Sequence, residues 1–555
     1  MKLANKALLI AALGAAIAAP AFSQDDSSAL FADQPTGSST SAAKTPAAAQ
    51  SADASAGSDF TLSLAGNHEF GYRLPANDAS NFSYVSDNGT DMKVPYFSNE
   101  YDVTVKDKDV KFMSNWNVTL EPSLTDGGNT SWSDLVTAKP LENYVSWSPS
   151  GWKLTGGYQI FSWGVADKRN PTDNLNPRDY TVGVNADKIP VLAADAIWYP
   201  SDAFSVEGVF LPSSQSSEYP VNFETAAVSG VAQVSSSVEQ QALATVYAKL
   251  AAQYGTAYAT SYVNTLASSY SITSNPTDGT LNLDVKNFIA GAKLNYHSAA
   301  LDASVSYLYD IDPLYTPVFS VSYNAYSLPS SVTYSLERER LHRFGLDAKT
   351  TIAKFGLWTE ACYTLTPNTG SDDYAYRKSD LNYVIGADVN FGPNDVGYVN
   401  LQYIGTWIPG YDDSFYKDLK AGKITDPTEA YERALVNGLG LQTEGLLQGV
   451  TTNIKYELAD GAFTPQITAV YVVPFLYDDT NETRYGSLAL NPEIDVKPVD
   501  SFHIILGVDL AYAWVKTAGS DSVSLDTTTD KIGVYTSSNN VYLKILYKWN
   551  YDLKK

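Results

Sequence analysis

The residues of this chain with the clearest chemical potential lie between Trp163 and Tyr180. The tetrad Asn-Pro-x-Asp occurs twice there, at 170–173 and at 176–179. Asn before Pro is held out of the helical region, and Asn and Asp side chains close turns onto nearby backbone, so a rigid loop is predicted. Its candidate constriction and binding residues are Asp167, Lys168, Arg169, Asp173, Arg178 and Asp179. A guanidinium on a rigid loop can grip an anionic group of a solute.

The same Pro and Asn residues would also serve a loop that only braces two strands, so this alternative stays open. The carboxylates lack the spacing of an EF-hand calcium loop. The four histidines have no serine at local spacing to act as a nucleophile, although a triad assembles in space. No Walker loop, zinc-ligand spacing or dinucleotide fingerprint occurs. We therefore expect no catalytic residues, no metal site, no cofactor and no enzyme activity.

The segments that must position this loop repeat a hairpin pattern. A short phrase of glycine, an aliphatic residue and a charge recurs at 291–293, 345–347, 386–388 and 507–509. In each predicted strand, apolar and polar side chains alternate, so one face avoids water and the other seeks it. A soluble sandwich gives the same alternation, and the pattern alone does not define the environment.

Features outside the strands indicate a membrane barrel. Residues 1–23 have the basic, apolar and small-residue parts of a secretory signal peptide. No later stretch approaches the roughly 20 apolar residues of a membrane helix, so a membrane location requires a closed barrel. The only cysteine, Cys362, has no internal disulfide partner. Aromatic residues precede several strand-ending prolines, where an interfacial girdle would lie.

The end of the chain carries a targeting signal. Residues 541–549 alternate apolar and aromatic residues with Lys544 and Lys548, and they resemble the C-terminal insertion signal of outer-membrane barrels. Residues 550–555 follow the expected terminal aromatic, so the match departs from the usual pattern at this point. We expect the barrel-assembly machinery to insert the chain.

The predicted fold class is all-β. We expect a signal peptide at 1–23, a disordered periplasmic linker at 24–57, and at 58–555 a transmembrane antiparallel up-and-down β-barrel. It should have about 16 strands, in a range of roughly 14 to 18, with short periplasmic turns and long extracellular loops. Further strands would lie within 121–139 and 521–537.

Two long loops carry helix signals. Ser236 and Glu239 form a capping box ahead of an apolar stripe that runs to Tyr254. Asp426, with a proline and a glutamate after it, begins the second helix. Each stripe could fold into the barrel mouth or lie over the outer rim, and periodicity favours neither.

The polar strand faces supply candidate pore-lining residues, which are Lys153, Gln159, Asp195, Glu207, Lys293, Arg343, Asp347, Glu360, Asp388, Lys455 and Asp509. The chain has 37 basic and 61 acidic residues, yet charges on the polar faces nearly cancel, so the acidic surplus belongs mainly to the loops. No nucleic-acid partner is expected. Single charges merely solvate a wet wall, whereas a ring of charges at a constriction gives selectivity.

A strand ends in Gly-x-Gln-x-x-x-Trp-Gly at 157–164 and leads into the Asn-, Asp- and Pro-rich loop. Over residues 140–212 this arrangement resembles a group of largely uncharacterised, porin-like bacterial outer-membrane barrels. The resemblance implies transport across the outer membrane of a diderm bacterium and names no substrate. We expect a channel for passive diffusion of small polar solutes, surrounded by outer-membrane lipids, as a single barrel or a homo-oligomer. The alternative is a surface adhesin or structural anchor with a plugged lumen.

Overall fold

The computed structural model describes residues 60–75, 92–93, 96–120, 123–124, 130–131, 136–167, 169–180, 186–218, 238–240, 242–268, 273–277, 287–313, 316–324, 328–367, 377–411, 423, 445–474, 482–517, 523–525 and 532–554. The predicted signal peptide and linker lie outside these residues and stay predictions, as does the second predicted helix after Asp426.

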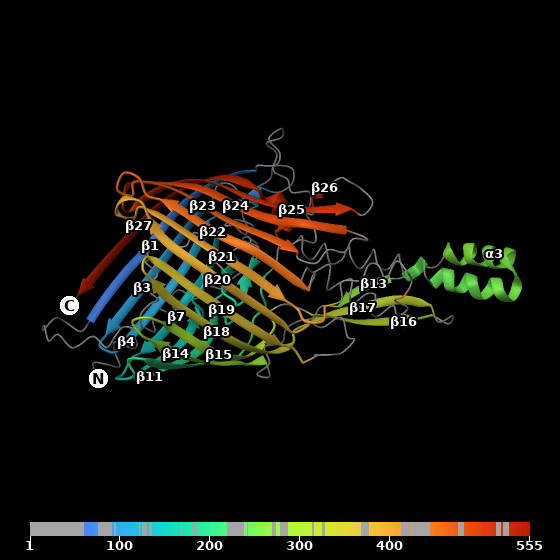
Figure 1. Ribbon diagram of the computed structural model, residues 1–555, viewed down its shortest axis with the longest axis horizontal. Helices are drawn as coiled ribbons and strands as arrows, with labels where there is room; N and C mark the ends of the chain where they lie inside the picture. The colour runs from blue at the N-terminus through green and yellow to red at the C-terminus, as the bar shows by residue number, and fades with distance from the viewer. Residues whose placement is uncertain are drawn as a thin grey trace.

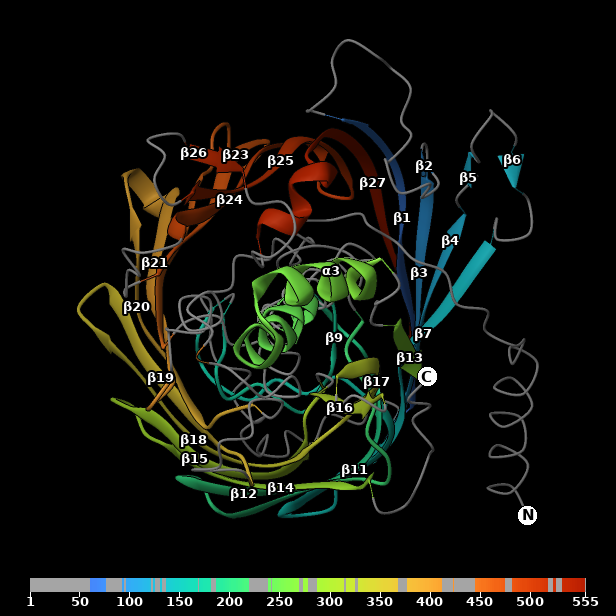
Figure 2. The ribbon, with the colours of Figure 1, turned by 90° about the vertical axis from the view of Figure 1, so that its right-hand side faces the viewer.

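The chain forms a closed antiparallel β-barrel (Figures 1 and 2). Eighteen strands make the ring, and one further strand, β26 (Val523–Leu525), lies outside it. The ring strands are β1 (Phe60–Pro75), β3 (Tyr96–Asp107), β4 (Val110–Leu120), β7 (Val136–Trp147), β8 (Trp152–Gln159), β11 (Val191–Ser201), β12 (Phe204–Leu211), β14 (Ile289–His297), β15 (Asp302–Ile311), β18 (Arg340–Ile352), β19 (Phe355–Leu365), β20 (Asp380–Phe391), β21 (Gly397–Trp407), β22 (Leu446–Tyr456), β23 (Phe463–Pro474), β24 (Glu482–Val499), β25 (Phe502–Thr517) and β27 (Asn540–Lys554). The first and last strands pair from Thr61 opposite Lys554 to Pro75 opposite Asn540, which closes the ring.

The barrel carries its apolar side chains on the outside. Leu346, Ile385 and Leu401 are 54%, 59% and 54% exposed, whereas Asp347 and Gln402 on the opposite faces are 2% and 0% exposed. Removing a leucine or isoleucine side chain from water is worth about 1.5–3 kcal/mol, so a belt of such residues facing outward is stable only against an apolar environment. This arrangement confirms the predicted fold class.

The two ends of the barrel differ, as predicted (Figure 1). At the end where β1 begins and β27 ends, strands are joined by short turns, such as 107–110 and 352–355. Lys108 and Ala353 adopt φ values of 53° and 55° there, the left-handed conformation of tight turns. The long loops leave from the other end.

The predicted number of strands, about 16, is lower than the 18 observed in the ring. The difference arises because the sequence patterns did not identify β3 and β24 as strands. The described residues of the segments 121–139 and 521–537, expected to hold further strands, form β5 (Ser123–Leu124), β6 (Thr130–Ser131), β26, the start of β7 and the short helix η4 (Gly533–Ser538). None of these short strands adds a further strand to the ring. Pro492 and Pro498 argue against a strand in sequence, yet Pro492 stands in the β23–β24 ladder opposite Ile467.

A separate unit projects from the long-loop end (Figure 1). It contains a helical stretch at 242–254, α3 (Thr256–Ala267), and a small sheet of β13 (Thr273–Thr277), β17 (Pro329–Glu337) and β16 (Thr316–Tyr323). The predicted helix after Glu239 is therefore confirmed. It neither enters the mouth nor lies over the rim, because it stands away from the barrel, and Tyr254 of its stripe is 58% exposed. The remaining short elements are β2 (Met92–Lys93), β9 (Arg178–Asp179), β10 (Asp187–Lys188) and η3 (Pro393–Asp395).

Candidate functional site: a loop held inside the barrel

After β8 the chain turns into the barrel, and β9 lies within the ring of strands (Figure 2). The described residues between β8 and β11, within 160–190, are called the inner loop here. The side chain of Asn176 ties the two ends of this inner loop together. Its amide nitrogen donates to the carbonyls of Gln159, at 3.1 Å, and Ile189, at 2.9 Å, and its oxygen accepts from the Phe161 backbone N–H at 2.7 Å. Asn176 begins the second Asn-Pro-x-Asp tetrad, so the tetrad closes the base of the loop.

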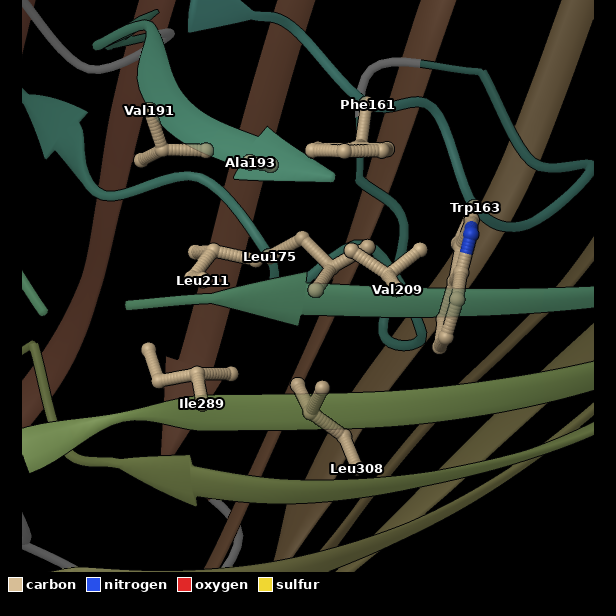
Figure 3. Close-up of a cluster of buried hydrophobic side chains, with 9 residues drawn as sticks. All are labelled: Phe161, Trp163, Leu175, Val191, Ala193, Val209, Leu211, Ile289 and Leu308. Atoms are coloured by element: carbon tan, nitrogen blue, oxygen red, sulfur yellow. The ribbon is translucent and has the colours of Figure 1, made fainter. Parts of the chain in front are cut away.

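An apolar cluster packs the inner loop onto one side of the inner wall (Figure 3). Three residues come from the loop and six from β11, β12, β14 and β15. They are Phe161, Trp163, Leu175, Val191, Ala193, Val209, Leu211, Ile289 and Leu308. A Cβ on Gly291 of β14 would stand 2.9 Å from the Trp163 ring, so only glycine allows this ring to lie against the wall. The Trp163 indole N–H donates to the Glu207 carboxylate at 2.8 Å.

Glu360 of β19 holds the middle of the inner loop. Its carboxylate, in a residue only 1% exposed, accepts four hydrogen bonds: from the backbone N–H of Val165 (3.0 Å), Ala166 (3.1 Å) and Thr172 (2.7 Å), and from the Thr172 hydroxyl (2.8 Å). Gly164 has φ 98°, and a Cβ there would lie 2.6 Å from both carboxylate oxygens. The backbone therefore wraps around this one side chain.

Gln402 of β21 holds the next part of the loop. Its side-chain oxygen accepts from the Asp167 N–H at 3.0 Å and from the Trp358 indole N–H at 2.9 Å. Its amide nitrogen donates to the Asp167 carbonyl and to the Thr451 hydroxyl. In the ring, β11, β12, β14, β15 and β18 lie between β8 and β19. The inner loop therefore reaches across the barrel interior and is fastened to strands distant from its base.

The charged residues of the inner loop divide into paired and unpaired groups. The Asp173 carboxylate lies 2.6 Å from Lys188 Nζ and 3.3 Å from the Arg178 guanidinium. Asp179 lies 3.7 Å from Lys139. Within the part of the chain that the structure describes, the exposed Arg169 has no ion-pair partner for its side chain. Lys168 lies outside the described residues.

All of the candidate pore-lining residues lie on the inward faces of their strands. Gln159, Glu207 and Glu360 contact or support the inner loop. Others bond along the wall: Arg343 to Asp310 at 2.7 Å, Lys293 to Asp347 at 3.9 Å, Lys455 to Glu457 at 2.9 Å, Asp388 to the Tyr398 hydroxyl at 3.3 Å, and Asp509 to the Asn491 amide at 2.8 Å. Lys153 lies at the short-turn end of β8, opposite Ile197, and Asp195 lies in the middle of β11, opposite Thr155. Their role in a solute path stays a prediction.

A second segment lies inside the barrel beside the inner loop. Helix η4 packs on β25, and the Tyr535 hydroxyl donates to the Tyr180 carbonyl at 2.6 Å. Burial raises the pKa of this tyrosine hydroxyl, so it stays a donor in ordinary conditions. The Asn539 side chain accepts from the Ala511 N–H at 2.6 Å, in place of a strand neighbour. Sequence patterns gave no sign of this contact.

A group of ion-paired side chains lies at the end of the barrel from which the long loops leave. The Arg377 guanidinium contacts Asp312 at 3.1 Å and Asp380 at 2.6 Å. Burial opposes the charge on this arginine, but the two carboxylates outweigh burial and raise its pKa.

The histidines lie apart from one another. His68 and His342 face outward beside Asn99 and Tyr307, and His297 contacts Asp302 in a turn. His503 faces inward, and its ring nitrogen Nδ1 lies 3.0 Å from the Asp495 carboxylate. In the described ranges there is no group of three or more metal-ligating side chains, and no helix there is long and apolar enough to cross a membrane. The expected absence of catalysis stays a prediction.

No protein-family model and no curated protein matches this chain. Among solved structures, it is similar to OccAB4 of Acinetobacter baumannii (TM-score 0.43, 9% identity, covering 89% of this chain and 99% of that one) and to OpdO of Pseudomonas aeruginosa (0.41, 11%, 89% and 98%). A third similar structure is Pseudomonas aeruginosa OpdK with vanillate (0.42, 8%, 89% and 99%). These likenesses are too low to carry an argument about activity. The chain's own strand pairing identifies it as a closed antiparallel β-barrel with an apolar outer face.

Proposed function

We propose that this chain is an outer-membrane channel through which small polar solutes diffuse passively. The apolar outer belt suits lipid, and closure leaves no strand edge unpaired around the ring at membrane depth. Barrels of this size enclose water unless loops fill them. In the proposed orientation the short turns face the periplasm and the long loops face outward. Insertion by the barrel-assembly machinery and assembly into a homo-oligomer stay predictions.

The observation that carries the proposal is the fastening of the inner loop by Glu360. A segment that crosses the interior and is fixed at both sides narrows any aqueous path, so its exposed groups decide which solutes pass. The proposed constriction residues are those at 167–169, 173, 178 and 179. Among them Arg169 is an exposed residue whose side chain has no ion-pair partner among the described residues, so it would favour solutes with an anionic group.

Reversal potentials across a planar bilayer with a salt gradient test this proposal. Replacement of Arg169 with Ala should shift ion preference toward cations, because it removes an uncompensated charge. Asp173 already compensates Arg178, so Arg178→Ala should change preference less. Unchanged preference in both variants would remove the loop from the selectivity mechanism.

A second candidate function is surface attachment by a barrel with a closed interior. The projecting helices favour it, because Tyr254 and Tyr258 are more than half exposed and their ring centroids lie 5.3 Å apart in a tilted pair. The Tyr262 ring stacks on Tyr258 at 6.2 Å and continues the row. Tyrosine offers a large contact area at low entropic cost. Folded, inserted barrels that give no conductance would favour this candidate over the channel.

A further inference from the structure

The outer face of the barrel carries two basic residues at the end from which the long loops leave. Arg340 begins β18, and His342 is the next outward residue of that strand. The Arg340 guanidinium lies over the rings of Tyr309, at 4.3 Å, and Phe288, at 5.3 Å, and its Nη1 donates to the Phe288 carbonyl at 2.5 Å. His342 Nδ1 lies 2.8 Å from the Tyr307 hydroxyl oxygen. Both basic side chains are half-buried and are held among aromatic rings on the outward face.

The apolar belt begins directly beside these two basic residues and continues toward the short-turn end. The next outward residues of β18 are Phe344 and Leu346, and Val305 of β15 lies opposite Leu346; each of the three is about half exposed. Leu346 lies six positions after Arg340, which is roughly 20 Å along a strand, or about 15 Å of depth at a tilt near 40°. This depth is half of the roughly 30 Å hydrocarbon core of a bilayer. The basic residues therefore stand at the edge of an apolar surface that is one leaflet deep.

From this arrangement we infer that the outer face of β18 binds an anionic, phosphate-bearing lipid. A guanidinium carries a fixed positive charge and matches the geometry of phosphate oxygens, and an imidazole N–H also donates to such oxygens. Aromatic rings around the two basic side chains suit the boundary between lipid headgroups and acyl chains. The acyl chains would lie on Phe344 and Leu346. Because only an amphiphile contacts both the basic residues and the belt, a lipid is favoured over a free anion in water.

The lipid site lies on the opposite side of the wall from the proposed solute path. Arg343, between the outward His342 and Phe344, faces inward and is bonded to Asp310 at 2.7 Å, so its charge serves the interior. Arg340 and His342 face away from the interior and take no part in conduction. The placement of the site in the outer leaflet rests on the proposed function, because the long loops face outward there, whereas lipid binding itself does not.

Calorimetric titration of the purified full chain in neutral detergent micelles with dioctanoyl phosphatidylglycerol tests the inference. Dioctanoyl phosphatidylcholine has the same chains and a headgroup without net charge, so it should bind wild type more weakly. Arg340→Gln should bind the anionic lipid about tenfold more weakly, the loss expected for one charge-assisted hydrogen bond. Lys354→Gln is the matched control, because Lys354 also lies over an aromatic ring, that of Phe355 at 6.0 Å, but in a short turn at the other end of the barrel. It should bind like wild type.

Four results would overturn the inference: equal affinity of wild type for the two lipids, equal affinity of Arg340→Gln and Lys354→Gln for the anionic lipid, displacement of that lipid by an equal concentration of inorganic phosphate, or a wild-type dimer that Arg340→Gln dissolves. The third would make a free anion the ligand, and the fourth a second copy. If Arg340→Gln does not fold, as judged by heat-modifiable gel mobility, His342→Gln repeats the test. Conductance of Arg340→Gln should equal that of wild type, so failure of lipid binding and failure of the channel proposal are distinguishable.

Discussion

Replacement of Glu360 with glutamine tests how the inner loop is held. Each carboxylate oxygen accepts two of the four hydrogen bonds, and glutamine retains only one accepting oxygen. Two loop donors would lose their acceptor and face an NH₂ group instead. An unsatisfied buried donor costs about 1–3 kcal/mol, so the docked loop should lose roughly 2–6 kcal/mol relative to an undocked one. That loss is enough to populate the undocked loop.

Single-channel recording in planar bilayers measures the consequence. With the loop partly undocked, we expect a larger mean conductance and more open-channel noise for Glu360→Gln than for wild type. Asp388→Asn is the matched control, because it removes an inward carboxylate on the neighbouring strand whose hydrogen bond goes to Tyr398. If Glu360→Gln behaves like wild type and Asp388→Asn does not differ from either, the reasoning about the anchor is refuted.

The other predictions concern the inner wall, the outer apolar belt and the inner loop. Gly291→Val should displace Trp163, because even a Cβ at this position comes within 2.9 Å of the indole ring. A shift in tryptophan fluorescence checks this displacement. Gly208→Val is the control, because a Cβ there meets nothing within 4 Å. Leu346→Lys should cost about 2–4 kcal/mol and lower the folded fraction in lipid vesicles, because the residue faces lipid; the same loss with Tyr323→Lys on the projecting sheet would contradict the assignment of the belt. Arg169→Ala should move the reversal potential toward cations in a planar bilayer with a salt gradient.

Alternation along the strands was sufficient to predict the barrel. Ile385 and Ala387 lie on one face of their strand and Asp388 lies on the other, so side-chain polarity alternates with a period of two residues. This alternation does not depend on the conformation of the loops. The alternation of apolar and polar residues did not determine the number of strands, because β24 contains two prolines and β3 carries many polar residues. Proline is tolerated in a strand only at certain positions of the hydrogen-bonding ladder. The strand register determines which positions these are, and the sequence alone does not give the register.

The candidate site was only partly predictable. The paired tetrads identified a rigid loop, since Asn-Pro restricts the local backbone. Its partners could not be identified, because Glu360 and Gln402 are 188 or more residues away along the chain and look like any other polar residue of a strand. Proximity of this kind comes from barrel closure. For the same reason, the sequence did not distinguish Arg169 from Arg178, since the Asp173 contact depends on the folded loop.

The conductance of the wild-type chain in a planar bilayer is the decisive test of the proposed channel. We expect discrete current steps whose size grows with salt concentration, because ions would cross a water-filled interior narrowed by the inner loop. Correctly folded and inserted barrels that produce no steps at any salt concentration would contradict it.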